Sequence, residues 1–210
     1  LAHLVDYLER NAYDVNYCAG GGFGFTALVP LATWLPSSKR GTGLFSRDLF
    51  LTVAKTIRTG HGLDNLVNGL ELEAFVLPHR HPNEKDYGVT TGLFRSPRFK
   101  LVHFDDGGLV FLRAEGRLRD RAYAEAYEYV DPTNRRGNYC QLPSPDEEAL
   151  EHCLAESRIA MQRSAGNLLP LILHTFFCNE LGLWKQGYDT LAAREHFDID
   201  QRYAITNLMY

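Results

Sequence analysis

The spacing of apolar positions changes near residue 145, and this change predicts two kinds of structure along the chain. Before it, short apolar runs alternate with helical patterns, as in residues 14–18, 46–60 and 72–78. After it, apolar residues recur every three or four positions without strand-like alternation, which is typical of successive helices. We therefore predict an α/β domain over residues 1–140 and an all-α tail of helical hairpins over residues 141–210.

The clearest local prediction is a β-hairpin over residues 99–116. Two runs rich in β-branched and aromatic residues, FKLVHF and GLVFLRAEG, flank the sequence Asp105-Asp106-Gly107-Gly108. Asp-Gly between apolar runs is among the strongest signals for a hairpin turn. Two adjacent carboxylates could also serve acid–base chemistry, but at a hairpin tip we interpret Asp105 and Asp106 as turn residues.

The helices are predicted from apolar periodicity together with residues that cap or break helices. In the first domain, residues 46–60 and 62–70 carry helical patterns, with Ser46 placed to cap the first and Gly60 to end it. In the tail, Asp146 can cap a first helix and Gly182 can end a second one. The predicted tail helices cover residues 146–164, 167–182, 183–197 and 200–210.

A glycine-rich turn, AGGGFG over residues 19–24, follows a predicted strand and precedes a predicted helix. In that context the amides at a helix N-terminus can bind the pyrophosphate of a dinucleotide. Gly20, Gly22 and Gly24 would form the turn, and Asp48 follows at about the required spacing, although it lies in a helical pattern. A Rossmann-like sheet-and-helix domain would bind NAD(P) or S-adenosylmethionine there. We favour the alternative interpretation, a tight turn without a ligand.

Four segments carry a resemblance to a known family: VNYCAGGGFGFTALVP, LFSRDLFLTVAKTI, LEAFVLPHRHP and FKLVHFDDGGLVFLR. Together they resemble the soluble extracytoplasmic region of bacterial multi-pass glycosyltransferases of the C type, over residues 1–115. The resemblance implies a periplasmic, membrane-associated location. It also implies no chemistry in this chain, because the catalytic carboxylate of that family lies in its membrane part.

The tail resembles a degenerate tetratricopeptide (TPR) repeat, a helix–turn–helix unit of roughly 34 residues. The matching positions are Leu181-Gly182, Trp184, Gly187 and Ala193. A TPR-like tail implies a groove for a protein partner. The aromatic residues that we propose for partner contact are Trp184, Tyr188 and Phe177. A generic helical hairpin, with these aromatics in its core, is the alternative interpretation.

Composition and charge narrow the functional classes. The chain has 210 residues, 45% of them hydrophobic, and a net charge of -4, which argues against a nucleic-acid partner. Its longest apolar runs are too short to span a bilayer and contain proline. We interpret the basic cluster of residues 113–121 as a solvated face, because acidic residues interrupt it. His79 and His81 lack a second ligand cluster, so we predict no metal site. The four cysteines include no CxxC pair, and their disulfide state stays open.

These observations predict a non-catalytic docking or scaffold module, extracytoplasmic and associated with a membrane assembly. No catalytic residue is predicted. Its partner would be a protein or a membrane-embedded subunit. The alternative from another class is a cytoplasmic Rossmann-type enzyme that binds NAD(P) or S-adenosylmethionine at the glycine turn.

Overall fold

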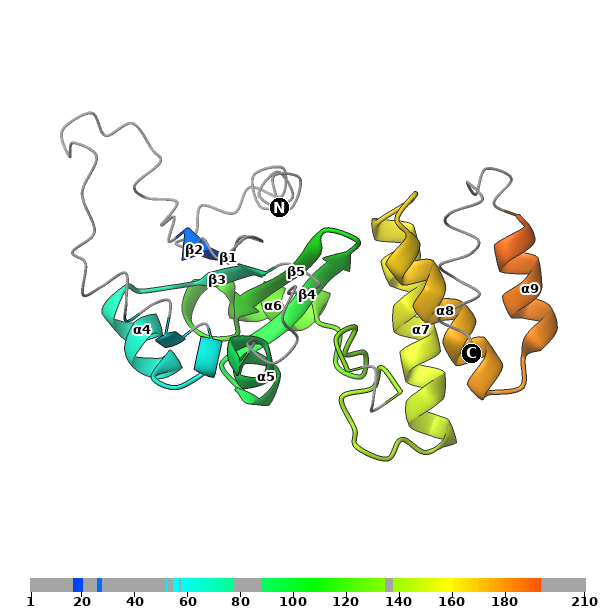
Figure 1. Ribbon diagram of the computed structural model, residues 1–210, viewed down its shortest axis with the longest axis horizontal. Helices are drawn as coiled ribbons and strands as arrows, with labels where there is room; N and C mark the ends of the chain where they lie inside the picture. Colours follow the sequence, from blue (N-terminus) through cyan, green and yellow to red (C-terminus); the bar gives the residue numbers. More distant parts are fainter. Residues whose placement is uncertain are drawn as a thin grey trace. The chain divides into compact units, whose positions relative to one another are not determined.

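The chain has a mixed α/β structure and folds into two units. The computed structural model describes residues 17–20, 26–27, 52, 55–56, 58–77, 88–134 and 138–193 (Figure 1). The first unit comprises residues 1–103 and 107–126, and the second comprises residues 104–106 and 127–210. The predicted boundary at residue 140 falls within the second of these units, where residues 128–130 are hydrogen-bonded to its first helix.

The first unit is built on a five-stranded sheet with the strand order β2-β1-β3-β5-β4. Strand β1 pairs in parallel with β3, whereas the β1–β2 and β3–β5 pairs are antiparallel. The predicted hairpin is confirmed, since β4 and β5 are neighbours joined at Asp106-Gly107. The strands are β1 (Tyr17–Gly20), β2 (Thr26–Ala27), β3 (Ala74–Leu77), β4 (Phe99–Asp105) and β5 (Gly108–Arg113).

The helices of the first unit follow the predicted pattern where the structure describes them. Residues 52, 55, 56, 58 and 59 are helical, and Gly60 follows them with a φ of 72°. The cap predicted at Ser46 lies outside the described residues. The remaining helices are α4 (Leu63–Gly69), α5 (Gly88–Arg95), the 3-10 turn η2 (Gly116–Leu118) and α6 (Arg119–Glu125).

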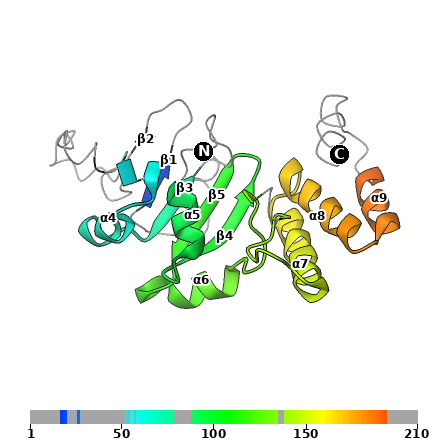
Figure 2. The same cartoon turned by 60° about the horizontal axis from the view of Figure 1, so that its bottom comes forward.

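Aromatic contacts place a helix on each face of the sheet, as Figure 2 shows for α5 and α6. On one face, Phe94 of α5 packs edge-on against Phe111 of β5, with ring centroids 5.1 Å apart. On the other face, Lys100 of β4 lies over the ring of Tyr123 in α6. Successive side chains of a strand point to opposite faces, so strands covered on both sides contain continuous apolar runs. This explains why every residue of β3 is buried.

Ion pairs connect helices, strands and loops of the first unit. The guanidinium of Arg98 donates to Asp64 and Asn68 of α4 at 2.9 Å each and also to Glu115. The basic cluster that we interpreted as a solvated face is indeed interleaved with carboxylates. Its pairs are Arg113–Glu115, Arg117–Glu73 and Arg121–Glu125.

The second unit is dominated by three helices, α7 (Glu147–Arg163), α8 (Leu168–Glu180) and α9 (Trp184–Ala192). They lie side by side in chain order in Figures 1 and 2. The predicted cap is confirmed, because the Asp146 carboxylate accepts from the amide of Ala149 at 2.9 Å. Gly182, with a φ of 68°, lies in the turn after α8 as predicted. Asp106, from the hairpin turn, accepts from the amides of Leu168 and Leu169 and caps α8.

One close backbone approach in the first unit requires glycine. A Cβ at Gly88 would lie 2.2 Å from the carbonyl carbon of Thr59, and one at Gly60 would lie 2.5 Å from the carbonyl oxygen of Gly88. Backbone atoms cannot rotate away from such a contact as a side chain can. Gly69, at the end of α4, has no atom within 4 Å of the same position.

We predict that Gly88→Ala lowers the free energy of unfolding by about 2 kcal/mol or more, because overpacking against backbone forces the chain to shift. Gly69→Ala is the matched control and should change stability by less than about 1 kcal/mol, in the stabilising direction expected of a helical position. Urea denaturation of the full chain measures both values. Equal destabilisation by the two variants would contradict the role assigned to the close approach.

Candidate functional site

A groove of about 940 Å³ runs along the surface of the helical unit, between the end of α7 and the length of α9. Its lining is mostly apolar, with single charged groups among the apolar ones. The lining residues are Arg158, Met161, Gln162, Gly182, Leu183, Trp184, Lys185, Gln186, Asp189, Thr190 and Ala193.

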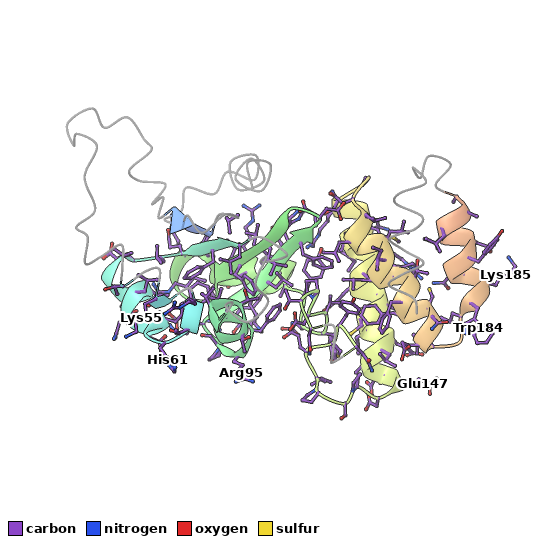
Figure 3. The ribbon with its side chains drawn as sticks, viewed as in Figure 1. Lys55, His61, Arg95, Glu147, Trp184 and Lys185 are labelled. Carbon is purple, nitrogen blue, oxygen red and sulfur yellow. The ribbon has the colours of Figure 1, made fainter. Side chains whose placement is uncertain are left out.

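An exposed aromatic pair lies on α9, and one of its members, Trp184, lines the groove. Trp184 is 72% exposed and Tyr188, four residues later, is 70% exposed. Side chains four positions apart lie next to one another on a helix, so the two rings form one stripe. Figure 3 shows the side chains of Trp184 and Lys185 extending from the first turn of α9. Because aromatic side chains of this size usually bury much of their surface, an exposed pair is a candidate for a contact surface.

The charged side chains beside this stripe carry a net positive charge. Lys185 pairs with Asp189 along the helix, and the bond to the carboxylate raises the pKa of the Lys185 ammonium. On the α7 side of the groove, Arg158 has no carboxylate partner among the residues that the structure describes. The groove therefore carries one net positive charge beside an apolar surface.

Close packing between α8 and α9 fixes the direction in which the aromatic pair points. A Cβ at Gly187 would lie 3.2 Å from the Cβ of Cys178 and 3.6 Å from a methyl carbon of Thr175. The absent side chain at Gly187 lets α9 approach α8 closely, and Gln186 donates to the Cys178 sulfur at 3.6 Å. With Gly187 facing α8, Trp184 and Tyr188 are left on the solvent side.

The third aromatic residue predicted for partner contact does not belong to this surface. Phe177 is completely buried, and its ring packs edge-on against that of Phe176. It lies on the face of α8 that forms the core of the unit, so Phe177 stabilises the helical unit and is not available for a partner. Apolar periodicity identified the helix but could not assign its aromatic residues to a face.

The TPR positions inferred from the sequence also fall elsewhere in the structure. Gly182 lies in the turn between α8 and α9, whereas the Leu-Gly pair of a TPR unit lies within the first helix. Gly187, which we had placed near a turn, lies inside α9. Ala193 directly follows α9 and lines the groove. The residue-by-residue match is therefore shifted.

The glycine turn predicted as a nucleotide site has a different context from the one the fingerprint requires. Gly20 ends β1, and Thr26–Ala27 forms β2, which pairs antiparallel with β1. The described residue after the turn is thus in a strand, whereas the fingerprint needs the N-terminus of a helix at that place. Gly22, Gly24 and Asp48 lie outside the described residues, as do His79 and His81.

A buried polar cluster in the helical unit has the residue types of a nucleophile and its base. Ser157 Oγ donates to the carbonyl of Leu154 and lies 3.1 Å from Nδ1 of His174, whose Nε2 lies 3.7 Å from the Cys178 sulfur. Burial lowers the pKa of His174. Ser157 and His174 are at most 2% exposed, so no substrate can reach them in this structure. The cluster satisfies polar groups between α7 and α8.

The other chemical candidates lie in structural positions. His103 and Asp105 are buried, and Asp106 caps α8. Within the described part of the chain, no three His, Cys, Asp or Glu side chains gather as a metal site would require. None of the helices described is long and apolar enough to cross a membrane.

The segment before α7 is held by one carboxylate. Glu156 of α7 accepts hydrogen bonds from the consecutive amides of Glu128, Tyr129 and Val130 at 2.6–3.0 Å. Burial raises the pKa of the Glu156 carboxyl, while the three amide donors act in the opposite direction. This carboxylate connects an irregular segment to α7, the helix that provides one side of the groove.

Comparisons of this chain with protein families, with curated protein sequences and with solved structures found no match. We therefore infer the function from the geometry of the groove and from the resemblances found in the sequence.

We predict that Glu156→Gln lowers the free energy of unfolding by about 1–3 kcal/mol, because the amide NH₂ of glutamine would face a backbone N–H and leave it unsatisfied. Glu151→Gln, an exposed position on the same helix, is the control and should change stability by less than about 0.5 kcal/mol. Chemical denaturation followed by circular dichroism measures both. An equal, small effect of the two substitutions would show that Glu156 does not hold the segment.

Proposed function

We propose that this chain is a non-catalytic docking module whose helical unit binds a partner protein in the groove between α7 and α9. The observation that carries the proposal is the exposed stripe of Trp184 and Tyr188 on α9, of which Trp184 lines an apolar groove. Exposed aromatic residues over an apolar surface dominate the energetics of protein interfaces. The order of three consecutive helices joined by short turns supports a TPR-like tail, although the residue match is shifted.

The groove favours one kind of occupant. A helix that presents apolar side chains at positions i, i+3 or i+4, and i+7 would cover the groove residues Trp184 and Met161 together with the exposed Tyr188. One acidic side chain on that helix would neutralise Arg158, the cation on the α7 side of the groove. The proposed partner is therefore a protein that offers an amphipathic helix with an acidic residue beside its apolar stripe.

The location is proposed from the resemblance of residues 1–115 to the extracytoplasmic region of C-type glycosyltransferases. In this proposal the first unit joins the chain to a bacterial membrane assembly, and the helical unit binds the partner. The proposal assigns no reaction to the chain.

Selection from a displayed library of amphipathic helical peptides, with the full chain immobilised, tests the groove. We expect the selected peptides to share an apolar i, i+4, i+7 pattern with one acidic residue. Trp184→Ala and Tyr188→Ala should each weaken their binding by about tenfold or more, as expected for aromatic hot spots. Tyr123→Ala, a half-exposed tyrosine on α6, is the control and should leave the affinity unchanged.

Three outcomes would contradict the docking proposal. Selected peptides could bind Trp184→Ala as tightly as the unmodified chain, which would place their site elsewhere. The chain could self-associate through this face, so that a second copy is the occupant. A higher melting temperature in the presence of NAD(P) or S-adenosylmethionine would favour the enzyme alternative, because a ligand of the native state stabilises it.

The proposed location is tested separately by protease accessibility. Protease added to intact spheroplasts of the source cell should digest this segment of the endogenous protein, because an extracytoplasmic segment is exposed once the outer envelope is opened. A cytoplasmic protein serves as the control and should stay intact until the cells are lysed. Protection of the segment in intact spheroplasts would overturn the periplasmic location and leave the groove proposal standing.

A further inference from the structure

Two buried cysteines lie on segments of the second unit that pack against each other. Cys140 precedes α7, and Cys153 lies in the middle of α7. Both are free and completely buried. Their separation in the sequence means that tertiary packing, and not helix geometry, brings them together.

Backbone pairing positions Cys140 beside Val130. The two residues form an isolated antiparallel bridge. The bridge is flanked by a hydrogen bond from the Gln141 amide to the Tyr129 carbonyl at 2.7 Å and another from the Asp131 amide to the Tyr139 carbonyl at 2.8 Å. Residues 139–141 are therefore fixed against residues 129–131.

Side chains of α7 hold this paired segment at two points that bracket Cys153. On one side, the ring of Tyr129 stacks on that of His152, with centroids 4.3 Å apart. On the other side, Glu156 accepts from the amide of Val130 at 2.9 Å. Cys153 and Glu156 are three residues apart and share a face of the helix. The bridge to Val130 and the Glu156 contact thus hold the segment that carries Cys140 over the face of α7 that carries Cys153.

We propose that Cys140 and Cys153 form a disulfide bond when the chain folds in an oxidising environment. A disulfide in this position would join the irregular segment 127–140 covalently to α7, beside the Glu156 contact. It would close a short loop around Asp146, which caps α7. The proposal rests on the packing of the second unit alone, so it holds whether or not the groove binds a partner.

The oxidation is a thiol–disulfide exchange with a small-molecule or protein disulfide as the oxidant. The thiolate of one cysteine attacks the oxidant's disulfide and releases one thiolate from it, which leaves a mixed disulfide. The second cysteine, after losing its proton, attacks the sulfur of the first and displaces the oxidant's other thiolate. Two protein thiols are oxidised, one disulfide is reduced to two thiols, and the two protons pass to the released thiolates.

Burial in the folded unit keeps the pair from reacting once packing is complete. Burial raises the pKa of the Cys153 thiol, and the neighbouring Cys140 raises it further. Because the thiolate is the reactive form, exchange is slow in the packed state and fast before α7 has docked. The disulfide would therefore form during folding and would then be protected from reductants.

Refolding the full chain from denaturant in a buffer of reduced and oxidised glutathione tests the proposal. Free thiols are then alkylated without reduction, and peptide mass spectrometry identifies linked peptides. We expect one linked pair that joins Cys140 to Cys153, with Cys178 alkylated after denaturation. The oxidised chain should melt at least about 5 °C above the chain refolded in dithiothreitol, because the bond constrains the unfolded state.

Two alanine substitutions separate the bond from the loss of packing. Cys153→Ala removes a bond partner, and Cys178→Ala removes a buried cysteine of the same unit that has a different neighbour. The melting difference between oxidised and reduced chain should disappear in Cys153→Ala and persist in Cys178→Ala. If either variant fails to fold, identification of the linked peptides in the unmodified chain still tests the proposal. The absence of a Cys140–Cys153 link in refolded chain, or a link from either residue to another cysteine, would overturn the proposal.

Discussion

One half-buried carboxylate, that of Glu156, attaches the irregular segment before α7 to that helix. Glu156 provides the acceptors for three consecutive amides of a segment that has no regular structure. Amides that lose water without gaining a partner are costly, so this acceptor stabilises residues 128–130 against α7. Val130 in turn forms the bridge to Cys140, which places the segment that carries Cys140 over the face of α7 that carries Cys153. A single side chain of α7 therefore holds the irregular segment that precedes the three helices.

In the helical unit, residue size as well as polarity determines which side chains are buried in the core and which face the groove. Gly187 faces α8, where a Cβ would lie 3.2 Å from the Cβ of Cys178 and glycine therefore allows the closest approach. With this face of α9 against α8, Trp184 and Tyr188 face solvent, while Phe177 of α8 is buried. The proposed docking surface is thus a consequence of close helix packing. Its net charge comes from Arg158, which has no carboxylate partner among the described residues, beside the Lys185–Asp189 pair.

The fold was predictable from the sequence wherever a local signal was strong. The Asp-Gly hairpin, the buried strand before Pro78, the cap at Asp146 and the stop at Gly182 all appear as predicted, because each depends on residues that are neighbours in the chain. The structure divides the chain after residue 126, earlier than the predicted boundary at residue 140, and residues 128–130 attach to α7 through contacts distant in sequence. The glycine turn is followed by β2 where we expected a helix, since β2 gains its partner from β1 across the turn.

The sequence by itself determined the elements and their order: strands where apolar runs are short and continuous, helices where apolar residues recur every three or four positions, and turns where glycine or Asp-Gly interrupts them. Three aromatic residues were proposed from the sequence for partner contact. Only the tertiary structure decided that Trp184 and Tyr188 are exposed, that Phe177 is buried, and that Arg158 and Met161 line one groove with Trp184. The physical reason is that periodicity is a property of one segment, whereas burial, pairing and a groove require two segments to meet.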